Sequence, residues 1–332
     1  MSATLMQDIR AELSSATGLA VVEQEPMSRY TSLRIGGPAD YFVTATSRDA
    51  LIGAVRAARR LGVPFLVIGN GTNLLVGDGG VRGLVIRDRA QGVSRTVPAA
   101  DGTPLPPARE AEGTQSLWRV DAGVLWTQLA RISVAEGWLG AEWGNSIPGS
   151  VGAGVVSNAG AHGSDMAGHL TRVWVLDATD AVVEYPVNAL ALGYRTSRFK
   201  AHGAYARRGL SPAEIIVEVE MRLTRGTKAE GERRMRAYLA HRQATQPQGK
   251  SAGSTFKNPP GDSAGRLIEL VGLKGHRHGN AQFSPRHANF MMNLGGATAG
   301  DVLALLDLAR TRVLDQTGLA LETEIEIVGE KA

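Results

Sequence analysis

Three short clusters of polar residues hold the side chains best suited to chemistry. Tyr194 to Lys200 (YRTSRFK) is basic, aromatic and hydroxyl-bearing. Gly253 to Pro259 (GSTFKNP) places a serine after a glycine, among hydrogen-bond donors. Glu322 to Glu326 (ETEIE) has a glutamate at every second residue, so a strand would put all three carboxylates on one face. The serine could donate a proton and one carboxylate could point into a basic site. For the first and third clusters, the alternative is a solvated surface.

Hydrolytic and metal chemistry find little support in the sequence. No G-x-S-x-G turn surrounds Ser254, and no histidine lies in a pattern that marks a Ser–His–Asp triad. The spacing of His276, His278 and His287 fits no common metal site, so we favour surface or hydrogen-bonding roles for them and predict no metal. The chain has no cysteine, which excludes disulfides, thiolate catalysis and cysteine-ligated clusters.

A glycine-rich stretch, Trp143 to Gly168, is the segment around which these clusters would be arranged. Seven of its residues are glycine, and most of the others are Ala, Ser, Asn or Val. Glycine lets a main chain approach a ligand closely, and free N–H groups in such turns bind anions. We therefore interpret the stretch as the wall of a site for a flat, phosphate-bearing cofactor. A flexible linker is the alternative, but Ile147, Val151, Val155 and Val156 interrupt it.

A second glycine-containing loop, Gly69 to Leu75 (GNGTNLL), follows a short buried strand. It resembles the start of a dinucleotide fingerprint, but Leu74 occupies the place of the third glycine, so we reject a Rossmann fold. The loop could hold a pyrophosphate without that frame, and an ordinary turn is equally compatible with these residues.

Composition places the chain among globular proteins of two or three domains. It has 332 residues, 43% of them hydrophobic and 20% charged. The net charge of +4 is spread along the chain, and its densest basic group, Arg233 to Arg236, lies in a helical pattern beside acidic residues. We therefore expect anionic small-molecule ligands and no nucleic acid. Neither a signal peptide nor a membrane-length apolar run is present, so we expect a cytoplasmic protein with no membrane partner.

Apolar periodicity and turn residues predict a mixture of helices and strands, in which the block of sheet and helices after Arg225 is a separate domain. Residues 1–25 are expected to form a short helix and a connector, and residues 97–116 a surface loop or hairpin tip. The other expected elements are a strand–turn–strand over 30–43, a hairpin over 171–185, helices over 47–61, 126–138, 228–242, 263–271 and 298–316, and strands over 64–68, 83–87, 117–122, 214–223, 287–293 and 321–328.

Eight motifs in this order resemble the UDP-N-acetylenolpyruvoylglucosamine reductase family, flavoenzymes of peptidoglycan precursor synthesis. The motifs are RIGGPADYF, GNGTNLLV, SIPGSVGAGVVSNAGAHG, GYRTSRFK, SAGSTFKNP, AGRLIELVGLKG, HANFMMN and LETEIEIVG. The resemblance implies a vanillyl-alcohol-oxidase-like FAD-binding fold. Two FAD-binding subdomains (1–92 and 93–225) would precede a C-terminal α+β substrate-binding domain (226–332).

The resemblance also implies a reaction and three catalytic residues. NADPH and FAD would supply a hydride for reducing UDP-N-acetylglucosamine enolpyruvate to UDP-N-acetylmuramate. Arg195 would stabilise the enolate formed at the substrate carboxylate, and Ser254 would protonate the neighbouring carbon. Glu324 would help hold or polarise the enol form together with Arg195.

Further site residues carry over from the family in the same way, for a protein expected to be a monomer with FAD bound non-covalently. The spacing after Tyr194 resembles the branch without a substrate-covering insertion, and Lys250 is a further candidate for the substrate diphosphate. The implied substrate residues are Tyr194, Arg242, Lys257, Asn258 and His287. The implied cofactor residues are Gly69, Asn70, Gly71, Thr72, Asn73, Leu74, Gly123, Ile147, Pro148, Gly149, Ser150, Gly152, Asn158, Gly160 and Gly163.

Two other functions remain open from the sequence. The chain could be another flavin oxidoreductase of the same fold, acting on an alcohol or hydroxy acid, which would not need Arg195, Ser254 and Glu324 together. It could also be a nucleotide-sugar-binding or regulatory protein without catalysis.

Overall fold

The computed structural model describes residues 3–97, 111–201 and 210–331. Residues 98–110, most of the predicted 97–116 loop, therefore lie outside the described residues. The N-terminal part contains a four-stranded sheet in the order β1-β2-β5-β3, in which β5 runs parallel to both neighbours. The bounds are β1 Val22–Pro26, β2 Pro38–Ala45, β3 Phe65–Ile68 and β5 Val81–Asp88.

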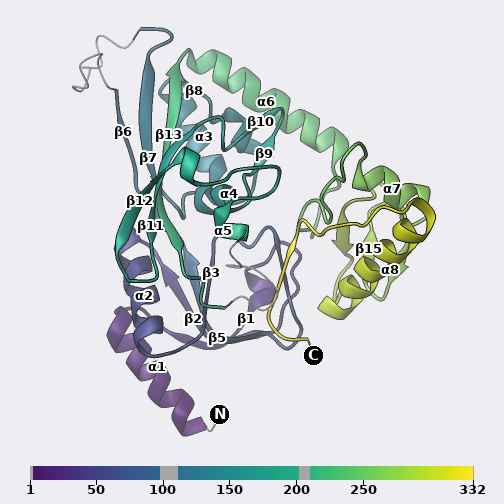
Figure 1. The fold of residues 1–332 in the computed structure, drawn as a ribbon, viewed down its shortest axis with the longest axis horizontal. Coiled ribbons are helices and arrows are strands. Elements are labelled where there is room, and N and C mark those ends of the chain that lie inside the picture. The colour runs from purple at the N-terminus through teal and green to yellow at the C-terminus, as the bar shows by residue number, and fades with distance from the viewer. Residues whose placement is uncertain (1–2, 98–110, 202–209, 332) are drawn as a thin grey trace.

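Helix α2 (Arg48–Arg60) covers this sheet, and α1 (Ala3–Thr17) packs against α2 (Figure 1). The predicted start of this helix at residue 47 is confirmed, because the Ser47 side chain caps the helix by accepting a hydrogen bond from the N–H of Ala50. The apolar face of α2 is buried against strand residues that include Val43 and Leu84. Burial of that face is what holds the helix on the sheet.

The central part is built on a six-stranded antiparallel sheet that contains the predicted hairpin and the long strand β13. Because β13 is central, all of its first seven residues are buried, including Glu218 and Glu220, which pair with arginines. The path is β12 (Val182–Pro186), β11 (Leu170–Leu176), β13 (Ile215–Arg225), β7 (Gln115–Asp121) and β6 (Val93–Thr96), with β8 (Trp138–Leu139) on β13.

Short helices and strands pack on one side of this sheet and carry the glycine-rich stretch. Their core includes Trp118, Trp126 and Val155. The elements are α3 (Trp126–Ala135), a 3₁₀ turn (Glu142–Ser146), α4 (Val151–Val156), β9 (Gly160–Ala161), β10 (Ser164–Asp165) and α5 (Arg198–Ala201); further 3₁₀ turns span Met27–Arg29 and Val187–Ala189.

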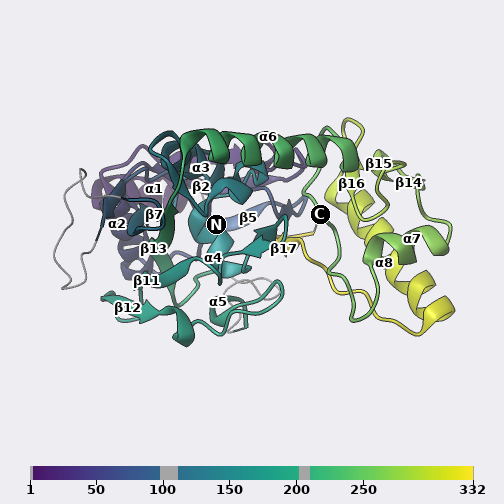
Figure 2. The same ribbon diagram turned by 90° about the horizontal axis from the view of Figure 1, so that it is seen from above.

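Helix α6 (Lys228–Thr245) leads from the six-stranded sheet to the C-terminal part, as Figure 2 shows. There α7 (Ala264–Leu270) and α8 (Ala299–Thr317) pack with the small sheet β14 (Arg277–His278), β15 (Ala281–Phe283) and β16 (Met291–Asn293) around a separate core. The predicted start of α8 is confirmed, because Thr298 and Asp301 form a capping box.

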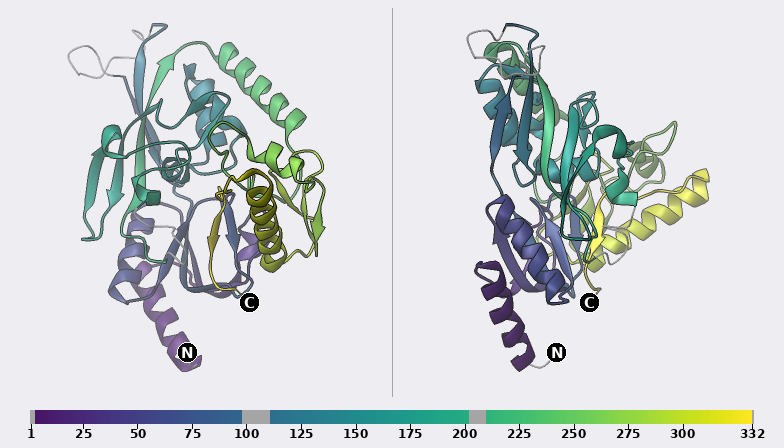
Figure 3. Two further views of the ribbon diagram at one scale, coloured as in Figure 1. Left: turned by 45° about the vertical axis from the view of Figure 1, so that its right-hand side comes forward. Right: turned by 60° about the vertical axis from the view of Figure 1, so that its left-hand side comes forward.

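The last strand returns to the N-terminal part of the molecule. Strand β17 (Glu326–Val328) pairs in parallel with β4 (Leu74–Val76), which directly follows the Gly69–Asn73 loop. Figure 3 shows these two strands side by side, although they come from opposite ends of the chain. The C-terminal segment therefore bridges two parts of the fold.

Three predicted strands are wrong in part. The strand–turn–strand over 30–43 is a turn up to Gly37, because Thr31 bonds the N–H and the carbonyl of Ile35 through its hydroxyl. The missing partner is β1, which lies in the predicted connector. Strands were also predicted over 287–293 and 321–328, but each is regular only at its last three residues. The earlier residues bond to nearby loops instead.

Candidate active site

The side chains of Arg195 and Glu324 meet in an ion pair between two segments far apart in sequence. Arg195 Nε lies 2.7 Å from Glu324 Oε1, and the two side chains are 23% and 17% exposed. Arg195 stands at the tip of a tight turn closed by hydrogen bonds between Gly193 and Thr196, and its φ is 52°. A left-handed arginine is uncommon and such backbone strain is concentrated at functional sites.

Ser254 lies beside Glu324 through the backbone. The N–H of Glu324 donates to the carbonyl of Thr255 at 2.8 Å, and the N–H of Lys257 donates to the carbonyl of Glu322. On its other side, Ser254 forms a β-bridge with Phe290. No described residue forms a hydrogen bond with the Ser254 hydroxyl, which leaves it free to act on a ligand.

The carboxyl of Glu324 lies in an environment that opposes its ionisation. Burial raises its pKa, while the nearby charges of Arg195, Lys200 and Lys257 lower it, and the net shift is upward. Burial therefore outweighs three cations. The charge of Glu324 therefore depends on the cations around it, and its ion pair with Arg195 depends on pH.

Two of the proposed substrate residues lie at the same corner. The Tyr194 ring is 59% exposed, and its hydroxyl accepts a hydrogen bond from the N–H of Asn258 at 3.3 Å. Asn258 is exposed, and its Oδ1 accepts a hydrogen bond from the N–H of Ala264. Lys257 is paired with Glu322 at 2.9 Å, and that glutamate is 75% exposed. The aromatic ring and the lysine therefore border the Arg195–Glu324 pair.

The Gly69–Asn73 loop presents its backbone donors unpaired. Among the residues that the structure describes, none accepts a hydrogen bond from the N–H groups of Asn70, Gly71, Thr72 or Asn73. Gly71 has a φ of 62°, and a Cβ there would lie 1.9 Å from the carbonyl oxygen of Tyr30. The Asn70 amide fixes the loop to the Trp143–Gly168 stretch by donating to the Pro148 carbonyl at 2.7 Å. Consecutive free N–H groups of this kind suit a pyrophosphate.

The amide of Asn73 points away from such a ligand. The side-chain Nδ2 donates to the backbone carbonyl of Glu324 at 3.0 Å, and the backbone carbonyl of Asn73 accepts from the N–H of Glu326. The same loop that offers free N–H groups thus holds the segment that carries Glu324. The sequence marks Asn73 as a loop residue, but its partner is 251 residues away and no local pattern could reveal it.

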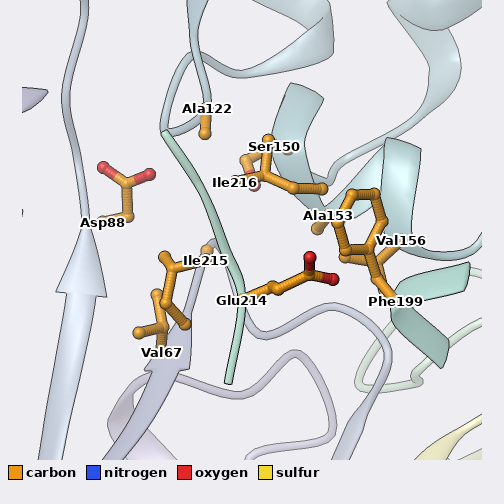
Figure 4. Close-up of a pocket in the computed structure, with 12 residues that line it drawn as sticks. Val67, Asp88, Ala122, Ser150, Ala153, Val156, Phe199, Glu214, Ile215 and Ile216 are labelled. Atoms are coloured by element: carbon orange, nitrogen blue, oxygen red, sulfur yellow. The ribbon is translucent and has the colours of Figure 1, made fainter. Parts of the chain in front are cut away.

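A pocket lies between the first sheet and the glycine-rich stretch. Apolar and small residues dominate its walls, which suits a flat aromatic group with few polar contacts. Figure 4 shows Ser150, Ala153, Val156 and Phe199 on one side of the start of β13, and Val67 and Asp88 on the other. The predicted residues Gly69, Ser150 and Gly152 line the pocket. A Cβ on Gly69 would lie 2.3 Å from Ser150 Oγ, so glycine is needed where the two loops meet.

Several other glycines allow close packing against neighbouring parts of the chain and not only against a ligand. A Cβ on Gly152 would lie 2.6 Å from that of Ala122, and one on Gly154 would lie 2.7 Å from Trp126 Nε1. A Cβ on Gly123 would lie 2.5 Å from Asp88 Oδ1, whereas Gly163 has open space around it. Small residues therefore bring α4 close to the six-stranded sheet as well as shaping the pocket.

Asn158 and Gly160 connect the stretch to the Arg195 turn. The Asn158 amide donates to the Gly193 carbonyl at 3.0 Å, and Arg195 Nη2 lies 3.4 Å from the Gly160 carbonyl. The other predicted cofactor residues lie in the facing loops: Ile147 ends a 3₁₀ turn, Gly149 is near Thr72 Oγ1, and Leu74 begins β4.

Arg242 and His287 lie in different surroundings. Arg242, on α6, donates to the carbonyl of Ser146, the first residue of the SIPG motif, and burial lowers its pKa. The ring of His287 is tilted against that of Phe290 with 4.8 Å between their centroids, its Nδ1 accepts from the N–H of Asn289, and burial lowers its pKa. Arg242 therefore borders the cofactor loops, whereas the contacts of His287 are within the C-terminal part.

The described part of the chain has neither a metal-binding cluster nor a membrane-spanning helix. Within residues 3–97, 111–201 and 210–331, no cluster of three or more His, Asp or Glu side chains has the arrangement of a metal site. Within the same ranges, no helix combines the length and the apolar character needed to cross a bilayer.

The fold and the pocket define the class of the protein. The family described as "FAD binding domain" matches residues 39–185, which include both glycine-rich loops. The chain is a flavin-dependent oxidoreductase with FAD as its cofactor.

Comparison with known proteins identifies the family. Residues 244–328 match the family described as "UDP-N-acetylenolpyruvoylglucosamine reductase, C-terminal domain". A reductase of that name from Anaeromyxobacter sp. (strain K) is 43% identical over 92% of this chain and 84% of its own length. Reductase 2 from Symbiobacterium thermophilum is 42% identical over 92% of this chain and 91% of its own. The chain belongs to the UDP-N-acetylenolpyruvoylglucosamine reductase family.

A solved structure agrees with this assignment. The crystal structure of UDP-N-acetylenolpyruvylglucosamine reductase (MurB) from Thermus caldophilus superposes with a TM-score of 0.71 and 36% identity. The match covers 93% of this chain and 98% of that one. The expected FAD-binding fold with a separate C-terminal domain is confirmed.

Proposed function

We propose that the protein reduces UDP-N-acetylglucosamine enolpyruvate to UDP-N-acetylmuramate with NADPH, through non-covalently bound FAD, in peptidoglycan precursor synthesis. The observation that carries the proposal is the Arg195–Glu324 ion pair, with the Ser254 hydroxyl on the adjoining segment. These three groups are those that reduction of an enolpyruvyl ether requires, and they come from three separate parts of the chain.

When bound, FAD supplies the hydride that is added to the enolpyruvyl double bond. The planar guanidinium of Arg195 binds the substrate carboxylate and stabilises the negative charge that develops there. The Ser254 hydroxyl gives its proton to the carbon beside that carboxylate and regains one from solvent. Glu324, as a carboxylate, holds the guanidinium of Arg195 in place.

Binding residues are assigned on the same basis. The free N–H groups of Asn70 to Asn73 would hold the FAD pyrophosphate, and the apolar pocket between the sheets would take an aromatic part of the cofactor. Tyr194 and Lys257 border the catalytic pair and would contact the substrate. Arg242, a buried cation beside the Ser146 carbonyl, is our choice for the substrate diphosphate.

Two measurements on the purified protein test the proposal. A flavin absorbance spectrum should be bleached by NADPH under anaerobic conditions and restored by UDP-N-acetylglucosamine enolpyruvate. UDP-N-acetylglucosamine, which lacks the double bond, is the matched control and should leave the flavin reduced. Restoration by an alcohol-derived ketone but not by the enolpyruvyl substrate would assign the protein to another flavin oxidoreductase. A protein without flavin or NADPH oxidation would be a binding protein.

The non-covalent attachment of FAD and the monomeric state have separate tests. After acid precipitation, the yellow colour should stay in the supernatant; colour retained in the pellet would contradict the assignment. Sedimentation should give a mass near the 35.1 kDa of one chain.

A further inference from the structure

A second ion pair lies beside the catalytic pair and joins the same two segments. Lys200 Nζ lies 2.6 Å from Glu326 Oε1, and the two side chains are 16% and 20% exposed. Arg195 and Lys200 come from one segment, and Glu324 and Glu326 from the other. Lys200 also acts electrostatically on Glu324, so one ammonium group lies near both carboxylates.

Both segments are fixed by contacts that do not involve these charges. On one side, Lys200 N–H donates to the carbonyl of Ser197, whose buried hydroxyl donates to Val156 in α4 at 2.6 Å. On the other side, Asn73 holds the backbone at both Glu324 and Glu326. The backbones of both segments are therefore held in place, and the side chains of both ion pairs are largely buried, unlike those of an ordinary surface pair.

The charged groups around Glu324 come from every segment packed against it. Arg195 and Lys200 face it from the 194–200 segment and Lys257 faces it from the Ser254 loop. Glu322 and Glu326 are its acidic neighbours on its own segment, and each is paired with one of those lysines. Asn73 and Thr255 contribute uncharged backbone or amide contacts.

We propose that Lys200 is a positioning residue for the reaction. Together with Glu326, it determines how much positive charge lies near Glu324, and it thereby keeps the Glu324 carboxylate paired with Arg195. The proposal rests on the proposed function, because it gives Glu324 a role in substrate reduction. Burial raises the pKa of Glu324, and Lys200 is among the cations that oppose this shift. Glu326 shares the charge of Lys200 and moderates its effect.

This arrangement predicts opposite effects for the two partners. Lys200→Met removes a cation and should raise the pKa of Glu324. Glu326→Gln removes an anion, leaves Lys200 free to face Glu324, and should lower that pKa. The readout is the rate at which the reduced holoenzyme is reoxidised by UDP-N-acetylglucosamine enolpyruvate, measured by stopped flow as a function of pH.

The rate should fall at acid pH as Glu324 is protonated. Lys200→Met should move this fall to higher pH by about 1 unit, the low end of the effect of one nearby charge. Glu326→Gln should move it to lower pH, and the double variant should return close to the original profile. Lys200→Arg retains the charge and should restore the profile, which a loss of folding would not allow. Flavin reduction by NADPH should keep its own pH profile in each variant.

Controls separate this inference from the proposed function. Glu184→Gln breaks an exposed pair with Arg172 on the β11–β12 hairpin and should leave the profile unchanged. Glu324→Gln should abolish the acid fall. If it does so but Lys200→Met and Glu326→Gln shift the fall in the same direction or not at all, the inference about Lys200 is wrong and the proposed function stands. If the fall persists in Glu324→Gln, the role given to Glu324 is wrong and the inference is overturned with it.

Discussion

Replacing Asp88 with asparagine should make the protein more stable, and by more at pH 8 than at pH 5. Asp88 is the last residue of β5, is 5% exposed, and lines the pocket between the first sheet and the glycine-rich stretch. Burial raises its pKa to about 7; a hydrogen bond from the Ala90 N–H and the charge of Arg89 oppose the shift, and Asp121 adds to it. No arginine or lysine forms an ion pair with Asp88 among the described residues.

The sign of the effect follows from proton linkage. The unfolded carboxyl loses its proton near the ordinary value of 3.8, whereas the folded protein keeps it up to a pH of about 7. Stability from this group is therefore fully present below the unfolded value and is lost as pH rises through about 7. Between pH 5 and pH 8 the loss covers about two pKa units, and at 1.36 kcal/mol per unit it amounts to about 3 kcal/mol.

Asparagine removes this loss because it is neutral at every pH and still offers an oxygen to the Ala90 N–H. The free energy of unfolding of Asp88→Asn, minus that of the original protein, should be about 3 kcal/mol larger at pH 8 than at pH 5. Urea unfolding of the flavin-free protein, followed by tryptophan fluorescence, measures both differences. Other titrating groups cancel, since the two proteins share them.

A matched variant on the surface controls for the general effect of removing a carboxylate. Asp177 is exposed, and hydrogen bonds from Thr179 and Ala181 lower its pKa, so it is ionised at both pH values. Asp177→Asn should therefore give the same difference at pH 5 and pH 8. An Asp88→Asn difference that is equally independent of pH would refute the reasoning.

Three further predictions concern the catalytic and cofactor sites. Ser254→Ala should leave flavin reduction by NADPH fast and slow reoxidation by substrate about 100- to 10,000-fold in stopped-flow experiments, and normal rates for both half-reactions would mean that another group donates the proton. Glu324→Gln should slow the same step about 100- to 1000-fold; an unaffected rate would remove this carboxylate from the mechanism. Gly152→Val should lower the flavin content of the purified protein, because even a Cβ would lie 2.6 Å from that of Ala122, and full retention would contradict the role of this packing.

Much of the fold was predictable because its signals are local. Apolar periodicity and capping residues placed α2 and α8, and alternation around a turn placed the β11–β12 hairpin. The missing third glycine at Leu74 correctly excluded a Rossmann fold. The errors occurred where side chains replace strand partners, as at Thr31, or where a strand such as β1 lacks a strong pattern of its own.

The sequence by itself determined which chemical groups are available and, through eight ordered motifs, the family to which they belong. Residue types and short spacings are enough for this, because they depend only on neighbours along the chain. Tertiary structure alone decided which of the three glutamates meets which cation: Glu322 pairs with Lys257, Glu324 with Arg195 and Glu326 with Lys200. It also decided that Asn73 holds the last strand. Such contacts join residues separated by up to 251 positions, and they exist only after β17 has returned to pair with β4.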